Sequence, residues 1–142
     1  MKKTAILSVG ILVLLGIGIY LGTSKNTTNQ NTLARMIETV DSSLFKTRTS
    51  EEERIIIDVR TPGEYSLGHI ESSRNIDFND PSFVDEIEQL DKNDAYSIYC
   101  RSGNRSGQAL ELMGTLGFTD VLDLQGGVIS WERNGNTLCT SC

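Results

Sequence analysis

Short apolar runs separated by helix-like patterns are the feature that most constrains the fold of this chain. Ile55 to Ile57 form a continuous β-branched run, which is typical of a strand buried on both faces of a sheet. Three more strands are predicted at residues 75–76, 95–99 and 120–124, and helical patterns lie between the strands. Strands that alternate with helices at this spacing form parallel sheets. The sequence therefore predicts an α/β fold in which helices cover both faces of a central parallel sheet.

The helices of this pattern are predicted from their apolar spacing and from the residues at their ends. A short amphipathic helix is expected to open the domain, with Thr32 as its N-cap. Its apolar positions recur at helical spacing and are Leu33, Met36, Ile37 and Val40. The other expected elements are a charged turn at 50–54 and helices at 62–68, 79–90, 106–116 and around Trp131.

An uncharged apolar segment, residues 5–22, precedes the domain, with Lys2 and Lys3 before it and Lys25 after it. As a helix this segment would be about 27 Å long, close to the roughly 30 Å hydrocarbon core of a bilayer. We expect an uncleaved anchor over residues 1–24, with a cleaved secretory signal as the alternative. The paired lysines favour a cytoplasmic N-terminus. The rest of the chain would then lie on the extracytoplasmic side, anchored to the cell membrane, or be periplasmic or secreted after cleavage.

Beyond this segment the chain divides into a linker, one acidic domain and a short tail. Residues 25–32 are predicted to be a polar linker, 33–138 the domain and 139–142 the tail. The whole chain has a net charge of −6, whereas the 118 residues after the anchor hold 11 basic and 19 acidic groups, a net charge of −8. Because nucleic-acid binders need a basic surface to neutralise phosphates, this balance argues against nucleic acid as a partner.

Cys100 lies where open α/β sheets bind their ligands, between a predicted strand and the next helix. The free N–H groups of such a loop and the positive end of the helix attract an anion, and Gly103 permits a positive φ there. Arg101 and Arg105 add positive charge, which favours a nucleophilic thiolate at neutral pH, and Arg105 could donate two hydrogen bonds to a tetrahedral anion. The residues alone also allow a buried structural cysteine followed by a basic helix cap.

Motifs along the whole domain accompany this loop. They are CRSGNRS at 100–106, Asp58-Val59-Arg60 and Gly68-His69-Ile70 before it, and Gly126-Gly127 and Trp131 after it. In this order they resemble the single-domain rhodaneses, the thiosulfate sulfurtransferase-like proteins. The resemblance spans residues 33–138 and implies a rhodanese-like α/β fold with about four to five parallel strands. In this chain one N-terminal hydrophobic helix would precede that fold.

The resemblance also implies a reaction. The Cys100 thiolate attacks the outer sulfur of a small anionic donor such as thiosulfate, sulfite leaves, and the persulfide passes its sulfur to a thiol or cyanide-like acceptor. The backbone of residues 101–105 would cradle the persulfide, and Arg105 would orient the oxyanion donor. The candidate substrate-binding residues are therefore Arg101, Ser102, Gly103, Asn104, Arg105 and Ser106. Neither a metal nor an organic cofactor is implied.

Two rival functions are weighed against this expectation. Cysteine phosphatases and related arsenate reductases use a C-x5-R loop that wraps a whole phosphate, whereas only four residues separate Cys100 from Arg105. The shorter loop suits a sulfur atom better than a phosphoryl group. The alternative from a different class is a non-catalytic rhodanese-like module that binds a partner or carries sulfur, although such a module has no need of the thiol and both arginines.

Several polar and aromatic residues outside the loop are expected to be structural. Asp58 and Arg60 follow a strand on the ligand side of the sheet and are expected to form an ion pair or to brace a loop with hydrogen bonds. His69 is the only histidine. Because attack by a thiolate needs no general base, His69 is expected to be a structural residue. Trp131 is expected to pack in or beside the core.

Cys139 and Cys142 form a C-x-x-C pair in the tail. We expect a small-loop disulfide in a frayed segment. A sharper hypothesis is that the pair takes sulfur from Cys100 or resolves its persulfide, and a third is a thiol–disulfide oxidoreductase centred on the pair. A metal site is not expected, because four ligands would be needed and the pair with a distant His69 falls short.

Overall fold

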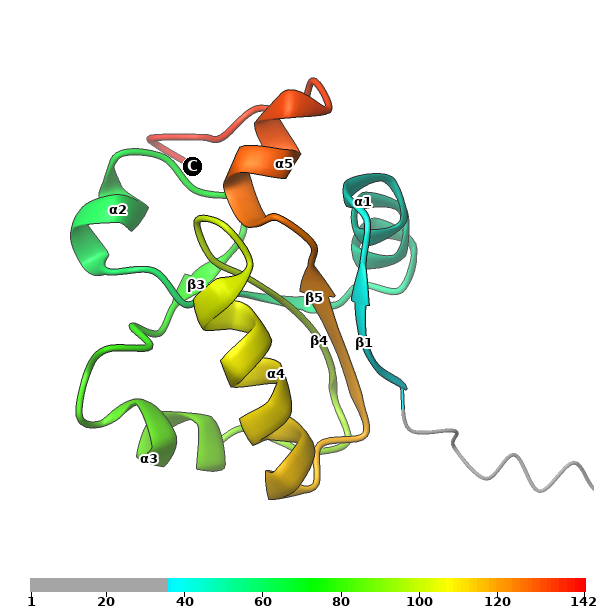
Figure 1. Cartoon of the computed structure of the whole chain (residues 1–142), viewed down its shortest axis with the longest axis vertical. Helices are drawn as coiled ribbons and strands as arrows, with labels where there is room; N and C mark the ends of the chain where they lie inside the picture. Colours follow the sequence, from blue (N-terminus) through cyan, green and yellow to red (C-terminus); the bar gives the residue numbers. More distant parts are fainter. Residues whose placement is uncertain (1–35) are drawn as a thin grey trace, which may run out of the picture. The chain divides into compact units, whose positions relative to one another are not determined.

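The computed structural model describes residues 36–142, in which five parallel strands form one sheet (Figure 1). The strands are β1 (Met36–Val40), β2 (Ile55–Asp58), β3 (Arg74–Asn75), β4 (Ala95–Tyr99) and β5 (Asp120–Leu124). The helices are α1 (Ser42–Glu51), α2 (Pro62–Ser66), α3 (Phe83–Glu88), α4 (Asn104–Leu116) and α5 (Gly127–Arg133). The strand order is β1-β5-β4-β2-β3, and every neighbouring pair is parallel. The predicted α/β class and parallel sheet are confirmed, with five strands.

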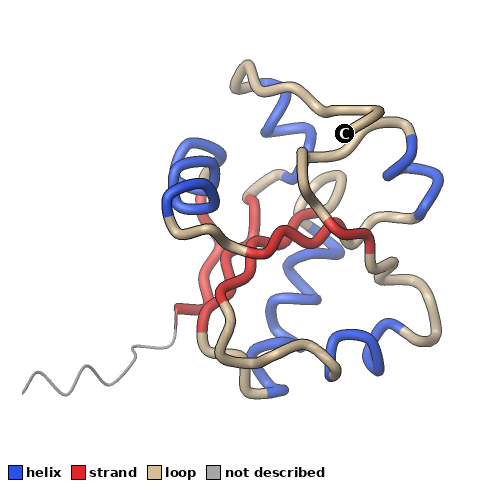
Figure 2. Tube along the Cα trace, turned by 180° about the vertical axis from the view of Figure 1, so that it is seen from behind, coloured by secondary structure: helices blue, strands red, loops and turns tan. Residues whose placement is uncertain are grey.

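Two apolar clusters cover the two faces of this sheet. Along β5, Val121 belongs to the cluster packed under α3 and α4, whereas Leu122 and Leu124 belong to the cluster packed under α1 and α5. Successive side chains of a strand point to opposite faces, so the two clusters lie on opposite sides of the sheet. Accordingly, α4 lies in front of the strands in Figure 1 and behind them in Figure 2. The predicted helical cover of both faces is confirmed.

The start of the domain differs from the prediction. The described part of the segment expected to be an amphipathic helix, Met36–Val40, is the edge strand β1. It pairs with β5 along its whole length, from Met36 beside Asp120 to Val40 beside Leu124. Ile37 packs against one cluster and Val40 against the other, as alternating strand positions must. The apolar residues whose spacing matched a helix therefore lie on the two faces of a strand. The segment is a strand because it forms backbone hydrogen bonds with the edge of β5, a partner that only the tertiary structure provides.

Helix α1 was not predicted, because its sequence is polar almost throughout. Its N-cap is Asp41, whose side chain accepts hydrogen bonds from the N–H groups of Ser43 and Leu44 at 2.8 and 3.0 Å. Only Ser42 and Phe45 are buried in it. The charged turn expected at 50–54 is therefore confined to the residues after Glu51.

The other predicted elements are found with small shifts at their ends. Strands β4 and β5 have the predicted bounds, β3 begins one residue earlier, and α3 begins only at Phe83. Ile57 is fully buried as expected, but Ile55 is 41% exposed because it lies at the open amino end of β2. Val84, which lies in the helix predicted at 79–90, is 43% exposed.

The predicted anchor at 1–24, with its apolar segment 5–22, and the linker at 25–32 lie outside the described residues, as do Thr32 and Leu33. From Met36 to Cys142, none of the helices combines the length and the apolar character that a membrane span requires. The membrane anchor consequently stays a prediction from the sequence.

Helix α1 can be tested by a pair of neighbouring substitutions. Phe45 is fully buried and its ring meets that of Trp131 edge-on, with 6.2 Å between the centroids. Phe45→Ala should lower the free energy of unfolding by about 3–5 kcal/mol, because it leaves a cavity in the core. Leu44 is 43% exposed, and Leu44→Ala should change stability by at most about 0.5 kcal/mol. Urea denaturation measures both; equal losses would contradict the packing described for α1.

Candidate active site

Cys100 follows the last residue of β4, the middle strand of the sheet, and is the first residue of the loop into α4. The thiol is held inside this loop, and the residue is 1% exposed. Its Sγ accepts a hydrogen bond from the N–H of Gly103 at 3.1 Å and another from Oγ of Ser106 at 3.4 Å. Cys100 therefore lies among hydrogen-bond donors at the positive end of a 13-residue helix.

The balance of two opposing effects sets the acidity of this thiol. Burial raises the pKa of Cys100, because it disfavours the charged thiolate. The hydroxyl of Ser106 and the backbone N–H groups of Ser106, Ser102 and Gly103 donate to the sulfur, and together they hold the pKa below its ordinary value. The loop therefore favours the thiolate, the nucleophilic form of cysteine.

The Gly126-Gly127 pair makes close backbone contact with the Cys100 loop. Gly127 has a φ of +57°, and a Cβ there would lie 2.3 Å from the carbonyl oxygen of Cys100. The N–H groups of Val128 and Ile129, at the start of α5, donate to the carbonyl oxygens of Cys100 and Arg101 at 2.9 and 3.2 Å. The first turn of α5 thus holds the loop in place through backbone hydrogen bonds.

Arg105 lies beside the loop, but its guanidinium is already paired. Its Nη1 and Nη2 each donate to one carboxylate oxygen of Glu64 at 2.8 Å. Arg105 is the main reason why the pKa of Glu64 is lowered to about 2, with help from Thr61, the N-cap of α2. The guanidinium expected to hold an oxyanion is bound to Glu64, a residue not predicted to belong to the site. Its one signal was the Thr61/Glu64 capping-box spacing, which locates a helix start and not a loop partner.

The remaining predicted loop residues differ in exposure. Ser106 is fully buried beside Cys100, whereas Arg101, Ser102 and Asn104 are exposed. A pocket of about 250 Å³ opens beside the loop and is lined in part by Arg101, Arg60, Glu64, Gly68 and Leu138. The structure thus brings together the thiol and its donors on the inside of the loop and leaves one arginine at its surface.

Asp58 and Arg60 form the expected structural ion pair. Nε and Nη2 of Arg60 donate to the Asp58 carboxylate at 2.6–3.0 Å, and both residues are buried. Nη2 also donates to the carbonyl oxygen of Gly68 at 2.7 Å, which braces the segment leading to His69. Trp131 is buried, as expected, and its Nε1–H donates to the carbonyl oxygen of Thr137 at 3.1 Å.

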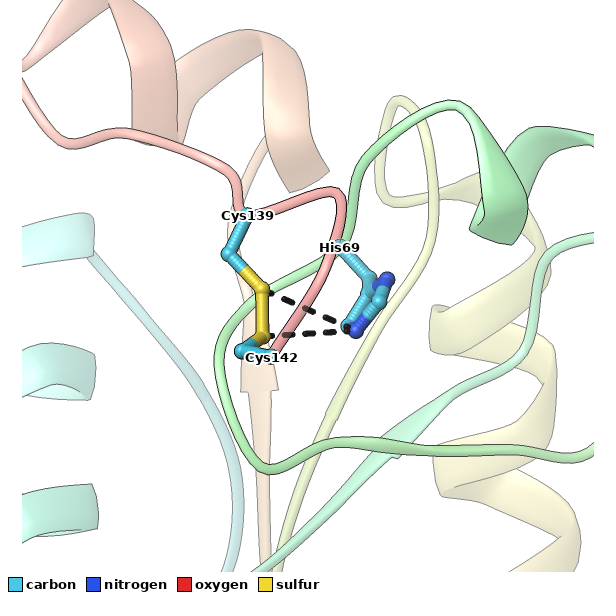
Figure 3. Close-up of side chains that lie close together, drawn as sticks. All are labelled: His69, Cys139 and Cys142. Atoms are coloured by element: carbon cyan, nitrogen blue, oxygen red, sulfur yellow. Dashed lines mark hydrogen bonds between the residues drawn. A yellow bond between two sulfur atoms is a disulfide. The ribbon is translucent and has the colours of Figure 1, made fainter.

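The tail differs from the prediction in two ways. The expected disulfide joins Cys139 and Cys142, but the segment is not frayed, because Cys139 and His69 exchange two backbone hydrogen bonds at 2.8 and 2.9 Å. His69 is also not distant from the pair: its Nε2 lies 3.9 Å from Sγ of Cys139 and 3.6 Å from Sγ of Cys142 (Figure 3). The β-bridge brings together residues that are 70 positions apart.

A buried carboxylate near the site was not predicted from the sequence. Asp123 on β5 is 2% exposed and accepts one hydrogen bond from Oγ1 of Thr39 at 3.1 Å. Its Oδ1 has no hydrogen-bond partner among the described residues. Burial raises the pKa of Asp123, and the hydrogen bond from the hydroxyl of Thr39 opposes the rise. The only signal was an acid set among the apolar residues of a predicted strand.

Comparison with known proteins agrees with this geometry. The family model described as a rhodanese-like domain matches residues 41–134. The chain belongs to the rhodanese family. Among the solved structures, a rhodanese-related protein from Thermoplasma volcanium has a TM-score of 0.65 and 26% sequence identity, and the match covers 73% of this chain and 99% of that one.

Curated rhodanese relatives include enzymes. A sulfurtransferase from Allochromatium vinosum is 33% identical over 70% of this chain and 92% of its own length. The thiosulfate sulfurtransferase GlpE of Pseudomonas paraeruginosa is 40% identical over 54% of this chain and 68% of its own length. Several other relatives are longer, and the chain spans about half of their length or less. These relatives support sulfur transfer as the role of the family to which the chain belongs.

The hydroxyl of Ser106 provides a test of how the rhodanese loop stabilises its thiolate. Ser106→Ala removes a donor to Cys100 Sγ, so the pKa of Cys100 should rise and the pH profile of its alkylation should move to higher pH. Ser102→Ala is the matched control, because the exposed Ser102 interacts with the thiol through its backbone N–H, which the substitution retains. The rate of iodoacetamide alkylation against pH measures both; an unmoved profile in Ser106→Ala would contradict the assigned hydrogen bond.

Gly127 provides a second test, of loop support. Gly127→Ala should lower the free energy of unfolding by about 2–4 kcal/mol, because the new Cβ meets the carbonyl of Cys100 in a left-handed backbone conformation. Gly107 in α4 has open space around it, and Gly107→Ala should raise stability by about 0.5–1 kcal/mol through helix propensity. Thermal and urea denaturation compare the two, and similar effects of both would argue against the close contact.

Proposed function

We propose that this chain is a sulfurtransferase that carries sulfane sulfur as a persulfide on Cys100. The observation that supports this most directly is the position of Sγ, which accepts hydrogen bonds from Gly103 and Ser106 at the start of α4. A structural cysteine in an apolar core would have a raised pKa, whereas burial is outweighed here by these donors. The names of the curated relatives support the same class of reaction.

In the first half-reaction, a sulfur atom is transferred from the donor to Cys100. The thiolate of Cys100 attacks the outer sulfur of thiosulfate or a similar donor and forms a sulfur–sulfur bond with it. The sulfur–sulfur bond within thiosulfate breaks, and its electron pair leaves with sulfite. Because the thiol is buried within the loop, the donor must be small. Arg101 at the loop surface is our candidate for attracting its anionic end.

The second half-reaction returns Cys100 to its starting state. A thiolate or cyanide attacks the outer sulfur of the persulfide, and Cys100 leaves as a thiolate. The donors that lower the pKa of Cys100 stabilise this leaving group as well, since they act on the same charge. Arg105 contributes positive charge beside the loop, while Glu64 holds its guanidinium in one orientation.

We also propose that residues 5–22 tether this activity to a membrane. The support is the uncharged apolar sequence itself, flanked by lysines. The globular domain would then act on the extracytoplasmic side, or in the periplasm if the segment is cleaved.

Mass spectrometry of the full-length chain tests the proposal. Incubation with thiosulfate should add about one sulfur mass, located on the Cys100 peptide, and cyanide should remove it and yield thiocyanate. Cys100→Ser should abolish the adduct. A variant with Cys139→Ser and Cys142→Ser should keep it, because the first transfer needs only Cys100.

The absence of any adduct in the unmodified chain would favour a non-catalytic module and contradict the proposal. An adduct that survives in Cys100→Ser would assign the sulfur to the tail cysteines instead.

A further inference from the structure

His69, Cys139 and Cys142 bring one nitrogen and two sulfur atoms together outside the rhodanese loop (Figure 3). These three ligand atoms all lie within 4.8 Å of one another. Nε2 of His69 is 3.9 Å from one sulfur and 3.6 Å from the other. In the structure the two sulfurs form a disulfide, which joins them by a covalent bond.

The hydrogen bond of Nδ1, the other ring nitrogen, determines which nitrogen of His69 carries the hydrogen in the neutral imidazole. Nδ1 of His69 lies 3.1 Å from the carbonyl oxygen of Tyr65, which can only accept. Nδ1 therefore carries the hydrogen in the neutral ring, and the lone pair of Nε2 points to the two sulfurs. A histidine that donates its second ring nitrogen to a backbone carbonyl is the arrangement typical of metal ligands.

Three contacts hold the imidazole and the tail in this arrangement. The ring of His69 stacks on that of Tyr65, with 3.9 Å between centroids and 11° between planes. The backbone groups of His69 and Cys139 exchange two hydrogen bonds. His69 is only 8% exposed, so the imidazole is held in place before any ligand arrives.

The distances fit a tetrahedral metal once the disulfide is opened. With zinc–sulfur bonds near 2.3 Å and zinc–nitrogen bonds near 2.0–2.1 Å, a tetrahedral site separates nitrogen from sulfur by about 3.6 Å. The two nitrogen–sulfur distances, 3.6 and 3.9 Å, are close to that value. Only the two sulfurs would have to move apart. Four protein ligands are needed for a closed structural site, but three suffice where the fourth position holds water or an exchangeable ligand.

We propose that the reduced chain binds one zinc ion through Nε2 of His69 and the thiolates of Cys139 and Cys142. A dithiol reductant supplies two electrons and two protons to the disulfide and is itself oxidised to a disulfide. Zinc then replaces the two thiol protons, which are released to solvent. The disulfide is the metal-free alternative of the same centre, so the oxidation state of the tail decides whether the ion is held. The ion would lie beside the pocket lined by Arg101, since Gly68 and Leu138 in its wall precede His69 and Cys139.

Cobalt(II) is the spectroscopic probe for this zinc site. The full-length chain, reduced by a phosphine without oxygen, should bind one equivalent of Co²⁺. Binding should give the intense visible bands of a tetrahedral ion and sulfur-to-cobalt charge-transfer absorption, and Zn²⁺ should displace it. The oxidised chain should show neither signal, because the disulfide sulfurs are not thiolates.

Variants separate this site from the rhodanese loop. Cys139→Ser together with Cys142→Ser should abolish the cobalt signal, whereas Cys100→Ser should keep one full equivalent. His69→Asn should raise the dissociation constant at least about tenfold, and its circular dichroism establishes whether it folds. Equal Co²⁺ binding by the oxidised chain or by the double serine variant would overturn the proposal, as would no binding by the reduced chain. Loss of the signal in Cys100→Ser would assign the ion to the loop and likewise overturn it.

Discussion

The contact between the first turn of α5 and the Cys100 loop is the constraint on which the site depends. Gly127 lies so close to the carbonyl of Cys100 that no side chain fits between them, and two N–H groups of α5 hold the loop carbonyls. With its carbonyl groups turned to α5, the loop turns N–H groups of residues 102, 103 and 106 to the sulfur. The parallel order β5-β4 makes this possible, because it sets the carboxyl ends of the two strands side by side.

Hydrogen bonds rather than unpaired arginines dominate the electrostatics of the loop. The guanidinium groups of Arg105 and Arg60 both form ion pairs within this chain, with the carboxylates of Glu64 and Asp58 respectively. A guanidinium that is paired with a carboxylate stabilises a nearby anion less than an unpaired guanidinium does, but the pairing holds its side chain in one position. The thiolate at Cys100 then depends on donors within 3.5 Å, whose effect falls off little with salt because they are buried.

How much could be predicted from the sequence depended on whether a residue's partner is local. Strands β4 and β5 and the position of Cys100 follow from contiguous patterns and were predicted correctly. The helix predicted in place of β1 was wrong, because Met36–Val40 is stabilised by pairing with β5, 84 residues later, and its apolar positions fit either period. The Glu64–Arg105 pair and the approach of His69 to the tail join distant residues, and their spacing in the sequence carries no signal for that.

A single tyrosine links the rhodanese loop to the sulfur pair of the tail. Tyr99 directly precedes Cys100, and its buried hydroxyl accepts the N–H of Ile70 at 2.9 Å and lies 3.0 Å from Oγ of Ser73. Burial raises the pKa of this hydroxyl, so it remains neutral and able to accept. Since Ile70 follows His69, the end of β4 fixes both the thiol and the imidazole. The Cys100 thiol and the tail disulfide therefore depend on one rigid support, although their sulfur atoms lie in separate segments of the chain.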